Sequence, residues 1–397
     1  MKILIADKLS EQAIDAIEQS GLDTEFCPEL SADELPNALS GINVLVVRST
    51  RVTAPAIDSA DCLSLIVRAG AGVNTIDVAA ASEHGIYVTN CPGRNSDAVA
   101  ELAIGLLIAC DRQIAGATAE LQAGQWSKKK YGNARGLKGR TLGILGMGMI
   151  GRGVADRARG LGMNVIAWSR SLTSQRAEDF GVTFAETTVG VARASDAVSI
   201  HVAANADTKH LINSSFLDAL PDGAILINTS RGDVVDTPAL KAAIESKKLR
   251  VGLDVFEDEP GSGSAEFADT ALAAMITGTP HIGASTDQAS EATAAEVVRI
   301  ITEFRETGRP PNTVNMCARS PATHSLVVRH YNQVGVLARI LEALRQEQIN
   351  VEEMENAIFA GASAACCTLQ LDQAPSENLL GELAQREHVL QVHLEPR

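Results

Sequence analysis

Three side chains in separate segments of the second half of the sequence could together bind a carboxylate and move a proton. They are Arg231 in NTSRGD, Glu259 in DVFEDEP and His281 in TPHIGAST. An arginine stays charged and can bind a carboxylate through two parallel hydrogen bonds. A histidine exchanges a proton near neutral pH, and a carboxylate at its other ring nitrogen favours the protonated form. Hydride transfer between a 2-hydroxy acid and a 2-oxo acid requires these groups beside a hydride carrier.

Each of the three residues also has an ordinary interpretation when it is considered alone. An arginine after a strand is commonly part of a surface ion pair. His281 follows Pro280 in what could be a simple turn, and Glu259 ends the acidic run EDE. Their common position favours catalysis, because each falls at the carboxyl end of a predicted strand, the side of an open α/β sheet where ligands bind.

A glycine fingerprint supplies a site for the hydride carrier. The segment LGILGMGMIG places Gly146, Gly148 and Gly151 between a predicted strand and a predicted helix, with Met149 and Ile150 in the turn. The first glycine permits the tight turn, the second lets a pyrophosphate approach the backbone, and the third lets helix and strand pack closely. Free backbone N–H groups and the helix dipole then bind the phosphates. The motif therefore predicts a dinucleotide site.

The residues after the next strand leave the choice of dinucleotide open. A carboxylate usually binds the ribose hydroxyls at this point, but here the chain has Trp168, Ser169 and Arg170. Without a carboxylate to repel a 2′-phosphate, and with Arg170 able to pair with one, NADP(H) could bind. Equally, Arg170 could lie over the adenine while NAD(H) binds.

The elements around these residues indicate an α/β fold with two Rossmann-like, doubly wound parallel sheets. Short apolar strands alternate with amphipathic helices in the first part of the chain, and a second such series begins at Thr141. Between them, a face of apolar positions predicts a long helix over 96–116 with Ser96 as its N-cap, either a hinge between domains or a core helix. A further helix should end near Gly308, and the segment GRPPNTVNMCARSPAT is typical of a linker.

The chain after the linker predicts a separate small domain. Residues 324–397 have the pattern of a strand, a helix, two strands, a helix and a last strand. This βαββαβ order is the ferredoxin-like split pattern.

Composition excludes several classes of partner. The 397 residues carry a formal net charge of −15, which works against binding to a nucleic-acid backbone. The amino terminus reaches charged residues too early for a signal peptide, and no run approaches the roughly 20 apolar residues of a membrane span. We expect a cytoplasmic protein that binds neither nucleic acid nor membranes. The seven cysteines lack CxxC spacing and have an odd count, so reduced thiols are expected, and no metal site is indicated.

The segments GxGxxG, NTSRGDVVD, GLDVFEDEP and TPHIGAST, in this order, resemble the D-isomer-specific 2-hydroxyacid dehydrogenases. The resemblance implies that Arg231, Glu259 and His281 form the catalytic set and that NAD(H) is the cofactor. We also assign Thr229 and Asp254, within these motifs, to the cofactor site. The family's organisation implies a discontinuous substrate domain of residues 1–97 and 285–316, a dinucleotide-binding domain of residues 98–284, a linker of residues 317–323 and a C-terminal domain of residues 324–397.

Within the family, the likeness is greatest to the enzymes that oxidise 3-phosphoglycerate in serine synthesis. Arg48 and Arg51 in VVRSTRVT and Arg68 in LIVRAGAGV would supply cations beyond the carboxylate anchor, as a small phosphorylated 2-hydroxy acid requires. The alternative for each arginine is a surface charge.

Two further segments complete the expected substrate site. Backbone N–H groups of Gly70, Ala71 and Gly72 could bind the carboxylate. Asn95 in CPGRNS matches an asparagine at the substrate site of the family, whereas its neighbour Arg94 departs from the small residues that are commoner there.

The C-terminal domain resembles the ACT domain, which binds serine in some of these enzymes. The segment HYNQVGVL places His330 and Asn332 at effector-contact positions, and Asn350 falls where a partner subunit's contact would come. Val334 replaces the usual proline of this motif. The resemblance implies L-serine as an effector and a homodimer through the nucleotide domain, or a homotetramer when ACT pairing doubles it. Alternatively, the ACT-like domain only pairs subunits.

Two other functions fit part of the sequence. Ser169 and Arg170 also suit an NADPH-dependent hydroxypyruvate or glyoxylate reductase. A nicotinamide-sensing scaffold, like the transcriptional co-repressors that share this fold and keep the same three residues, is the alternative outside the enzymes. A scaffold should bind the cofactor without useful turnover of a hydroxy acid.

Overall fold

The computed structural model describes residues 1–19, 21–260, 265–317 and 319–397. These residues form two compact units, Met1–Asn315 and Met316–Arg397. Residue 318 of the expected linker lies outside the described residues. The boundaries expected between the two domains of the first unit stay predictions.

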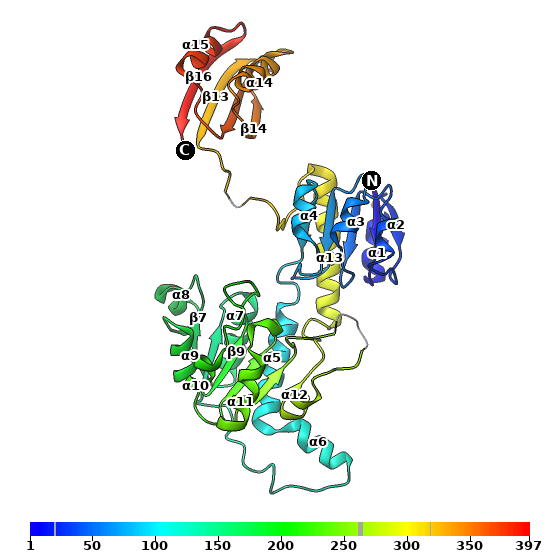
Figure 1. The fold of residues 1–397 in the computed structure, drawn as a ribbon, viewed down its shortest axis with the longest axis vertical. Coiled ribbons are helices and arrows are strands. Elements are labelled where there is room, and N and C mark those ends of the chain that lie inside the picture. Colours follow the sequence, from blue (N-terminus) through cyan, green and yellow to red (C-terminus); the bar gives the residue numbers. More distant parts are fainter. Residues whose placement is uncertain (20, 261–264, 318) are drawn as a thin grey trace. The chain divides into compact units, whose positions relative to one another are not determined.

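The first unit begins with a five-stranded parallel sheet. Its strands are β1 Lys2–Ile5, β2 Asp23–Phe26, β3 Val44–Val47, β4 Leu65–Arg68 and β5 Tyr87–Asn90. They lie in the order β2-β1-β3-β4-β5 (Figure 1). Its helices are α1 Glu11–Gln19, α2 Leu35–Ala38, α3 Ala54–Asp58, α4 Val78–Glu83 and, from much later in the chain, α13 Asp287–Thr307.

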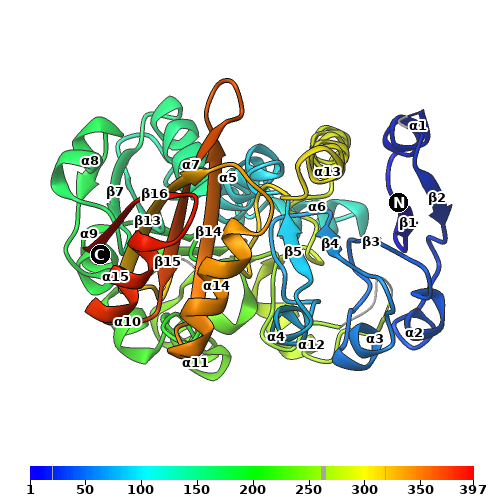
Figure 2. The same ribbon diagram turned by 90° about the horizontal axis from the view of Figure 1, so that it is seen from above.

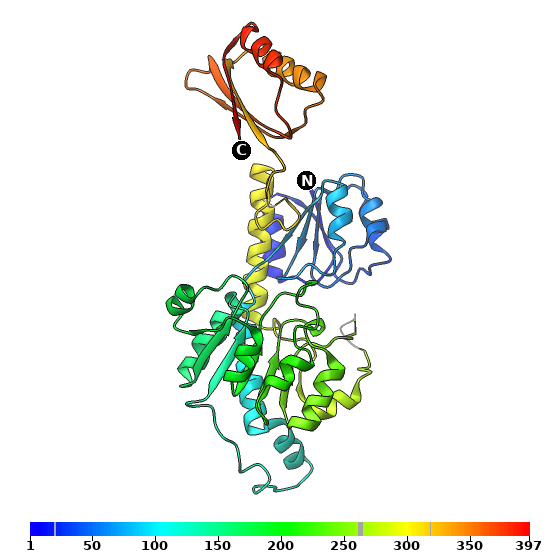
Figure 3. The same ribbon diagram turned by 60° about the vertical axis from the view of Figure 1, so that its left-hand side comes forward.

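Helices cover both faces of this sheet, which explains why its strands are continuous apolar runs. Ile17 of α1 and Val297 and Ile301 of α13 pack on one face, and α2, α3 and α4 pack on the other. Figure 3 shows α13 lying along the sheet. This helix begins at Asp287 with Thr286 as its N-cap and ends before Gly308, as the sequence predicts.

A seven-stranded parallel sheet follows. Its strands are β6 Thr141–Leu145, β7 Asn164–Trp168, β8 Thr183–Phe184, β9 Ala197–Ile200, β10 Ile225–Asn228, β11 Arg250–Leu253 and β12 Thr277–Gly278. The order β12-β11-β10-β9-β6-β7-β8 is that of a doubly wound dinucleotide-binding sheet. One face packs on α5 Ser96–Arg112, α7 Met149–Gly160 and α8 Ser174–Asp179. Over the other face lie α9 Thr188–Ala194, α10 Ser214–Ala219, α11 Thr237–Lys247 and α12 Thr270–Met275, with the short 3-10 helix η1 Gly232–Val234.

The expected single helix over 96–116 is two helices in the structure. Helix α5 ends at Arg112, Gln113 adopts a left-handed conformation with φ 52°, and α6 Ile114–Gln122 continues beyond it. A left-handed residue ends the helical hydrogen-bond ladder, and apolar periodicity does not reveal it. Asn95, not Ser96, occupies the N-cap position. The prediction of Ser96 as N-cap is therefore wrong by one residue.

The C-terminal unit has the βαββαβ order that the sequence predicts. Its elements are β13 His324–Tyr331, α14 Val336–Gln346, β14 Val351–Ile358, β15 Ala364–Leu371, α15 Glu377–Gln385 and β16 Val389–Pro396. The strands form an antiparallel sheet in the order β14-β15-β13-β16. Both helices lie on one face of it (Figure 2), where they enclose a separate apolar core.

No helix of the described residues is long and apolar enough to cross a membrane. Within the same residues, no group of three or more histidine, cysteine, aspartate or glutamate side chains could hold a metal ion.

Candidate active site

A cavity of about 1010 Å³ in the first unit gathers most of the predicted catalytic and substrate residues. The predicted residues that line it are Arg48, Arg68, Gly70, Asn95, Glu259 and His281. Arg231 lies beside this group: a Cβ built on Gly72 would be only 2.4 Å from its Nη2 atom. Ser290 and Thr293 of α13 also line the cavity. These two residues cannot be recognised from the sequence, because polar residues on a helix normally indicate its solvent face.

His281 and Glu259 form a hydrogen-bonded pair at the cavity wall. The Nδ1 atom of His281 lies 2.8 Å from Oε1 of Glu259. Burial opposes ionisation of Glu259, but its hydrogen bond to His281 and the positive charges of His281 and Arg231 hold its pKa below the usual value. Because Nδ1 is engaged, Nε2 is the ring nitrogen left for proton exchange with a substrate.

His281 has an unusual backbone conformation. Its φ of 53° lies in the left-handed region, which few residues other than glycine and asparagine adopt. The backbone N–H of His281 donates to the carbonyl of Asp254 at 2.8 Å. The carboxylate of Asp254 accepts hydrogen bonds from Thr279 Oγ1 and from the backbone N–H groups of Ile282 and Gly283, at 2.7, 2.8 and 2.8 Å. Asp254, which we assigned to the cofactor site, therefore holds the loop that carries His281.

The turn that carries Arg231 is organised by a buried residue that sequence analysis did not single out. Asn228, at the end of β10, donates from Nδ2 to the carbonyl of Arg231 at 2.9 Å, and its Oδ1 accepts from the N–H of Ser230 at 3.0 Å. Arg231 Nη1 donates to the carbonyl of Ser230 at 2.7 Å. In the sequence, Asn228 could have been recognised as a polar residue at the end of an otherwise apolar strand.

Three guanidinium groups meet at this end of the first sheet. Burial lowers the pKa of Arg68, and the positive charges of Arg231 and Arg48 lower it further. In the part of the chain that the structure describes, the guanidinium groups of Arg48 and Arg68 have no ion-pair partner, and Arg68 Nε is buried without a hydrogen bond. Asp7 lies nearby, but its carboxylate accepts the backbone N–H groups of residues 48–50 at 2.7–3.0 Å. The cluster therefore favours an anionic ligand.

The loop of residues 70–72 lies directly against two of these arginines. A Cβ built on Gly70 would be 1.6 Å from Nη1 of Arg68, just as one on Gly72 would collide with Arg231. The carbonyl of Ala71 accepts a hydrogen bond from Asn90 Nδ2 at 2.6 Å. Only glycine lets the arginines approach the backbone this closely, so the loop and the cations form one surface.

The glycine turn after β6 fits a dinucleotide. Gly146 has φ 97°, and a Cβ on Gly151 would lie 2.0 Å from the carbonyl oxygen of Gly146, so both must be glycine. A Cβ on Gly148 would meet nothing within 4 Å, which leaves room for a pyrophosphate at the amino terminus of α7. Met149 and Ile150 begin that helix. Near the end of β10, Thr229 is buried and its hydroxyl has no partner among the described residues.

Ser169 and Arg170 follow β7 at the expected position for the ribose. Arg170 is 83% exposed, and its Nη1 lies 3.9 Å from Oδ2 of Asp207. An ion pair this exposed and this long contributes little energy. Arg170 is therefore free to turn toward a phosphate.

The three effector candidates of the C-terminal unit are engaged within that unit. His330 is buried, with Nδ1 at 2.8 Å from the carbonyl of Tyr331 and Nε2 at 3.2 Å from Oδ1 of Asn356. Asn332 Nδ2 donates to the carbonyl of Ala362 at 3.1 Å, and Asn350 Nδ2 donates to Glu352 at 2.7 Å. Their role as effector contacts stays a prediction.

Comparison with known proteins agrees with this geometry. Residues 104–283 match the family described as D-isomer specific 2-hydroxyacid dehydrogenase, NAD binding domain. A D-3-phosphoglycerate dehydrogenase from Methanocaldococcus jannaschii is 38% identical over 320 residues, which are 80% of this chain but 60% of that protein. A hydroxypyruvate reductase from Thermotoga maritima is 41% identical over 281 residues, 70% of this chain and 89% of that protein. The chain thus spans about 60% of the length of the phosphoglycerate dehydrogenase and most of the reductase.

Solved structures show the same fold. The NADPH-dependent glyoxylate/hydroxypyruvate reductase from Sinorhizobium meliloti, determined in complex with NADP and malonate, is similar with a TM-score of 0.68 and 28% identity, covering 79% of this chain and 96% of that one.

Proposed function

Because this chain belongs to the D-isomer specific 2-hydroxyacid dehydrogenase family, we propose that it oxidises 3-phosphoglycerate to 3-phosphohydroxypyruvate with a nicotinamide cofactor. The main support for this proposal is the cluster of positive charge formed by Arg48, Arg68 and Arg231. A substrate with a carboxylate at one end and a phosphate at the other supplies the negative charge that three guanidinium groups require, whereas hydroxypyruvate supplies a single carboxylate.

The cavity residues divide the reaction between them. Arg231 binds the carboxylate and polarises the bond between the reacting carbon and its oxygen. Nε2 of His281 takes the hydroxyl proton while the hydrogen on the same carbon leaves with its electron pair, and Glu259 stabilises the imidazolium that forms. A nicotinamide cofactor held at the glycine turn would supply the acceptor for that hydride. In the opposite direction His281 returns the proton to the carbonyl oxygen.

Replacing Arg48 with glutamine tests the substrate. We expect the KM for 3-phosphohydroxypyruvate to rise roughly tenfold, because a charged hydrogen bond contributes about 1.5–3 kcal/mol, while the KM for hydroxypyruvate stays unchanged. Initial rates with both substrates measure this. Arg51→Gln is the matched control, since Arg51 lies in the same segment but is exposed and is not among the residues that line the cavity. Equal effects of Arg48→Gln on both substrates would contradict the phosphate role, and no turnover of either by wild type would favour the scaffold.

A second candidate is a hydroxypyruvate or glyoxylate reductase that uses NADPH. Two observations favour it: Ser169 and Arg170 replace the usual carboxylate, and the chain aligns with 89% of a hydroxypyruvate reductase. Wild-type preference for hydroxypyruvate over its phosphorylated form would select this candidate.

Cofactor choice can be tested separately from substrate choice. If Arg170 binds a 2′-phosphate, Arg170→Gln should lower kcat/KM for NADPH roughly tenfold and leave kcat/KM for NADH unchanged, because NADH lacks that phosphate. The exposed Arg193 of α9 provides the control variant Arg193→Gln. Equal kcat/KM losses with both cofactors would instead place Arg170 over the adenine.

The exposed surface of α6 supports a homo-oligomer. No residue of this helix is buried, and Ile114, Leu121 and Trp126 on the helix and the following loop are 46%, 58% and 81% exposed. A second copy of the chain would cover these apolar side chains. L-serine as an effector of the C-terminal unit remains part of the proposal through the ACT resemblance.

A further inference from the structure

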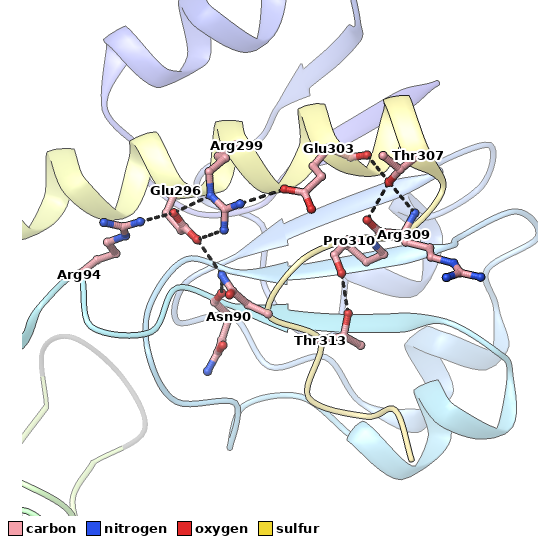
Figure 4. Close-up of polar contacts among 10 residues, drawn as sticks. Asn90, Arg94, Glu296, Arg299, Glu303, Thr307, Arg309, Pro310 and Thr313 are labelled. Carbon is pink, nitrogen blue, oxygen red and sulfur yellow. Dashed lines mark hydrogen bonds and ion pairs between the residues drawn. The ribbon is translucent and has the colours of Figure 1, made fainter. Parts of the chain in front are cut away.

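Glu296 is a buried carboxylate at the centre of a polar network between α13 and the substrate cavity (Figure 4). Its side chain is 3% exposed. Oε2 accepts from Arg94 Nη2 at 2.6 Å and from Arg299 Nε at 3.1 Å, and Oε1 accepts from Arg299 Nη2 at 2.6 Å and from Asn312 Nδ2 at 2.7 Å. Both carboxylate oxygens are therefore occupied, and the three partners come from three different segments.

The first branch of the network leads to Asn95. Arg94 and Asn95 are neighbours in the loop that connects β5 to α5. Asn95 lines the cavity, and its Oδ1 is buried without a hydrogen-bond partner among the described residues. A buried polar atom without a partner is costly and is expected where a ligand completes the contact. Arg94, whose guanidinium is bound by Glu296, directly precedes Asn95 in this loop.

The second branch leads to the loop of residues 70–72. Asn312, bound to Glu296, also donates to the carbonyl of Asn90 at 3.3 Å. The side chain of Asn90 in turn donates to the carbonyl of Ala71 at 2.6 Å. The branch therefore ends at the residue between the two glycines that lie against Arg68 and Arg231.

Glu296 would have a positively charged partner even without Arg94 and Asn312. Arg299 lies one turn further along α13 and donates two hydrogen bonds to it. These bonds, opposed by burial and helped by Arg94 and Asn312, lower the pKa of Glu296 to about 2. The carboxylate stays ionised at any pH near neutrality, so the network does not switch with pH. What Arg94 and Asn312 add is a connection from α13 to two loops of the cavity.

We propose that Glu296 is a positioning residue that sets the substrate loops through Arg94 and Asn312, so that Asn95 and the 70–72 backbone meet the substrate in a fixed arrangement. The inference rests on the proposed function, because it assigns these loops to a substrate. Arg94 departs from the small residues that are commoner in the family at this position, and its contact with Glu296 explains how a long side chain is accommodated there.

A double-mutant cycle tests this role. Arg94→Ala alone and Asn95→Ala alone should each raise the KM for the hydroxy acid roughly tenfold, with cofactor KM unchanged. If Arg94 acts through Asn95, then adding Arg94→Ala to Asn95→Ala should raise KM little further. Glu296→Gln should reproduce the KM effect of Arg94→Ala. Glu303→Gln is its control, because Glu303 also binds Arg299, at 2.9 Å, but contacts neither Arg94 nor Asn312.

The outcomes separate this inference from the proposed function. Fully additive effects of Arg94→Ala and Asn95→Ala, or equal KM changes in Glu296→Gln and Glu303→Gln, would overturn the positioning role even in an active enzyme. A wild type that uses only hydroxypyruvate would refute the phosphorylated substrate, and the cycle would then be measured with hydroxypyruvate. Arg94→Ala also keeps the test valid if Glu296→Gln fails to fold, because Glu296 remains paired with Arg299.

Discussion

Replacing His281 with asparagine should lower kcat roughly 10²–10⁴-fold and leave the Kd of the cofactor unchanged. An asparagine cannot exchange a proton near neutral pH, and general acid–base catalysis contributes about this factor. Asparagine is preferred to alanine because His281 has φ 53°, a conformation that asparagine adopts more readily than alanine. Steady-state rates in both directions measure kcat, and a fluorescence titration measures cofactor Kd.

His84→Asn is the matched control for this variant. His84 Nε2 lies 3.3 Å from Oδ1 of Asp58, so it is also a histidine beside a carboxylate, but it lies outside the cavity. Its replacement should leave kcat and KM unchanged. A fall in kcat of less than tenfold in His281→Asn would show that another group carries the proton, and a loss of cofactor affinity would show that His281 holds the cofactor loop instead.

Replacing Arg231 with lysine should lower kcat/KM about 100-fold although the positive charge is kept. A lysine presents a point charge and cannot bind a carboxylate with two parallel hydrogen bonds. Losing a charged hydrogen bond costs roughly 1.5–3 kcal/mol, and each 1.4 kcal/mol is a factor of ten. The lysine side chain is also shorter, so its ammonium would not reach the place beside Gly72 that the Arg231 guanidinium occupies. Rates at low concentrations of the 2-oxo acid measure kcat/KM directly.

Arg250→Lys provides the comparison for Arg231→Lys. Arg250 begins β11, and its Nη1 donates to the carbonyl of Asp111 at 2.9 Å, away from the cavity. This variant should lose some stability but keep kcat/KM. If both variants lose kcat/KM equally, the effect of Arg231→Lys would reflect packing of the sheet. If neither does, the substrate carboxylate binds elsewhere, for example to Arg68.

Features that depend on neighbouring residues in the chain could be predicted from the sequence. Arg231 and Glu259 follow the apolar strands β10 and β11, and parallel strands with buried faces have to be apolar throughout, so these runs and the polar residues after them are local features. The strand before His281 is only the short β12, Thr277–Gly278, because Met275 belongs to α12. The glycine turn is local for the same reason, since the contact between Gly146 and Gly151 is made within one turn. The βαββαβ order of residues 324–397 also rests on local periodicity.

Edge strands and helix ends could not be predicted as well. Strands β2 and β8 do not stand out in the sequence, because an edge strand pairs on one side only and needs no apolar run; β2 is DTEF, largely exposed. The left-handed turn at Gln113 was missed because its conformation leaves the apolar spacing on both sides intact.

The sequence alone determined which residue types are available for catalysis and in which motifs they lie. Only the tertiary structure brought Arg48 and Arg231 close enough to Arg68 for their charges to act on it. Only it placed Glu296 beside Arg94, 202 positions away in the chain. Hydrophobic periodicity reports which side of an element is buried and not which element it faces, whereas the pairing of charges depends on distances between elements that are remote in sequence.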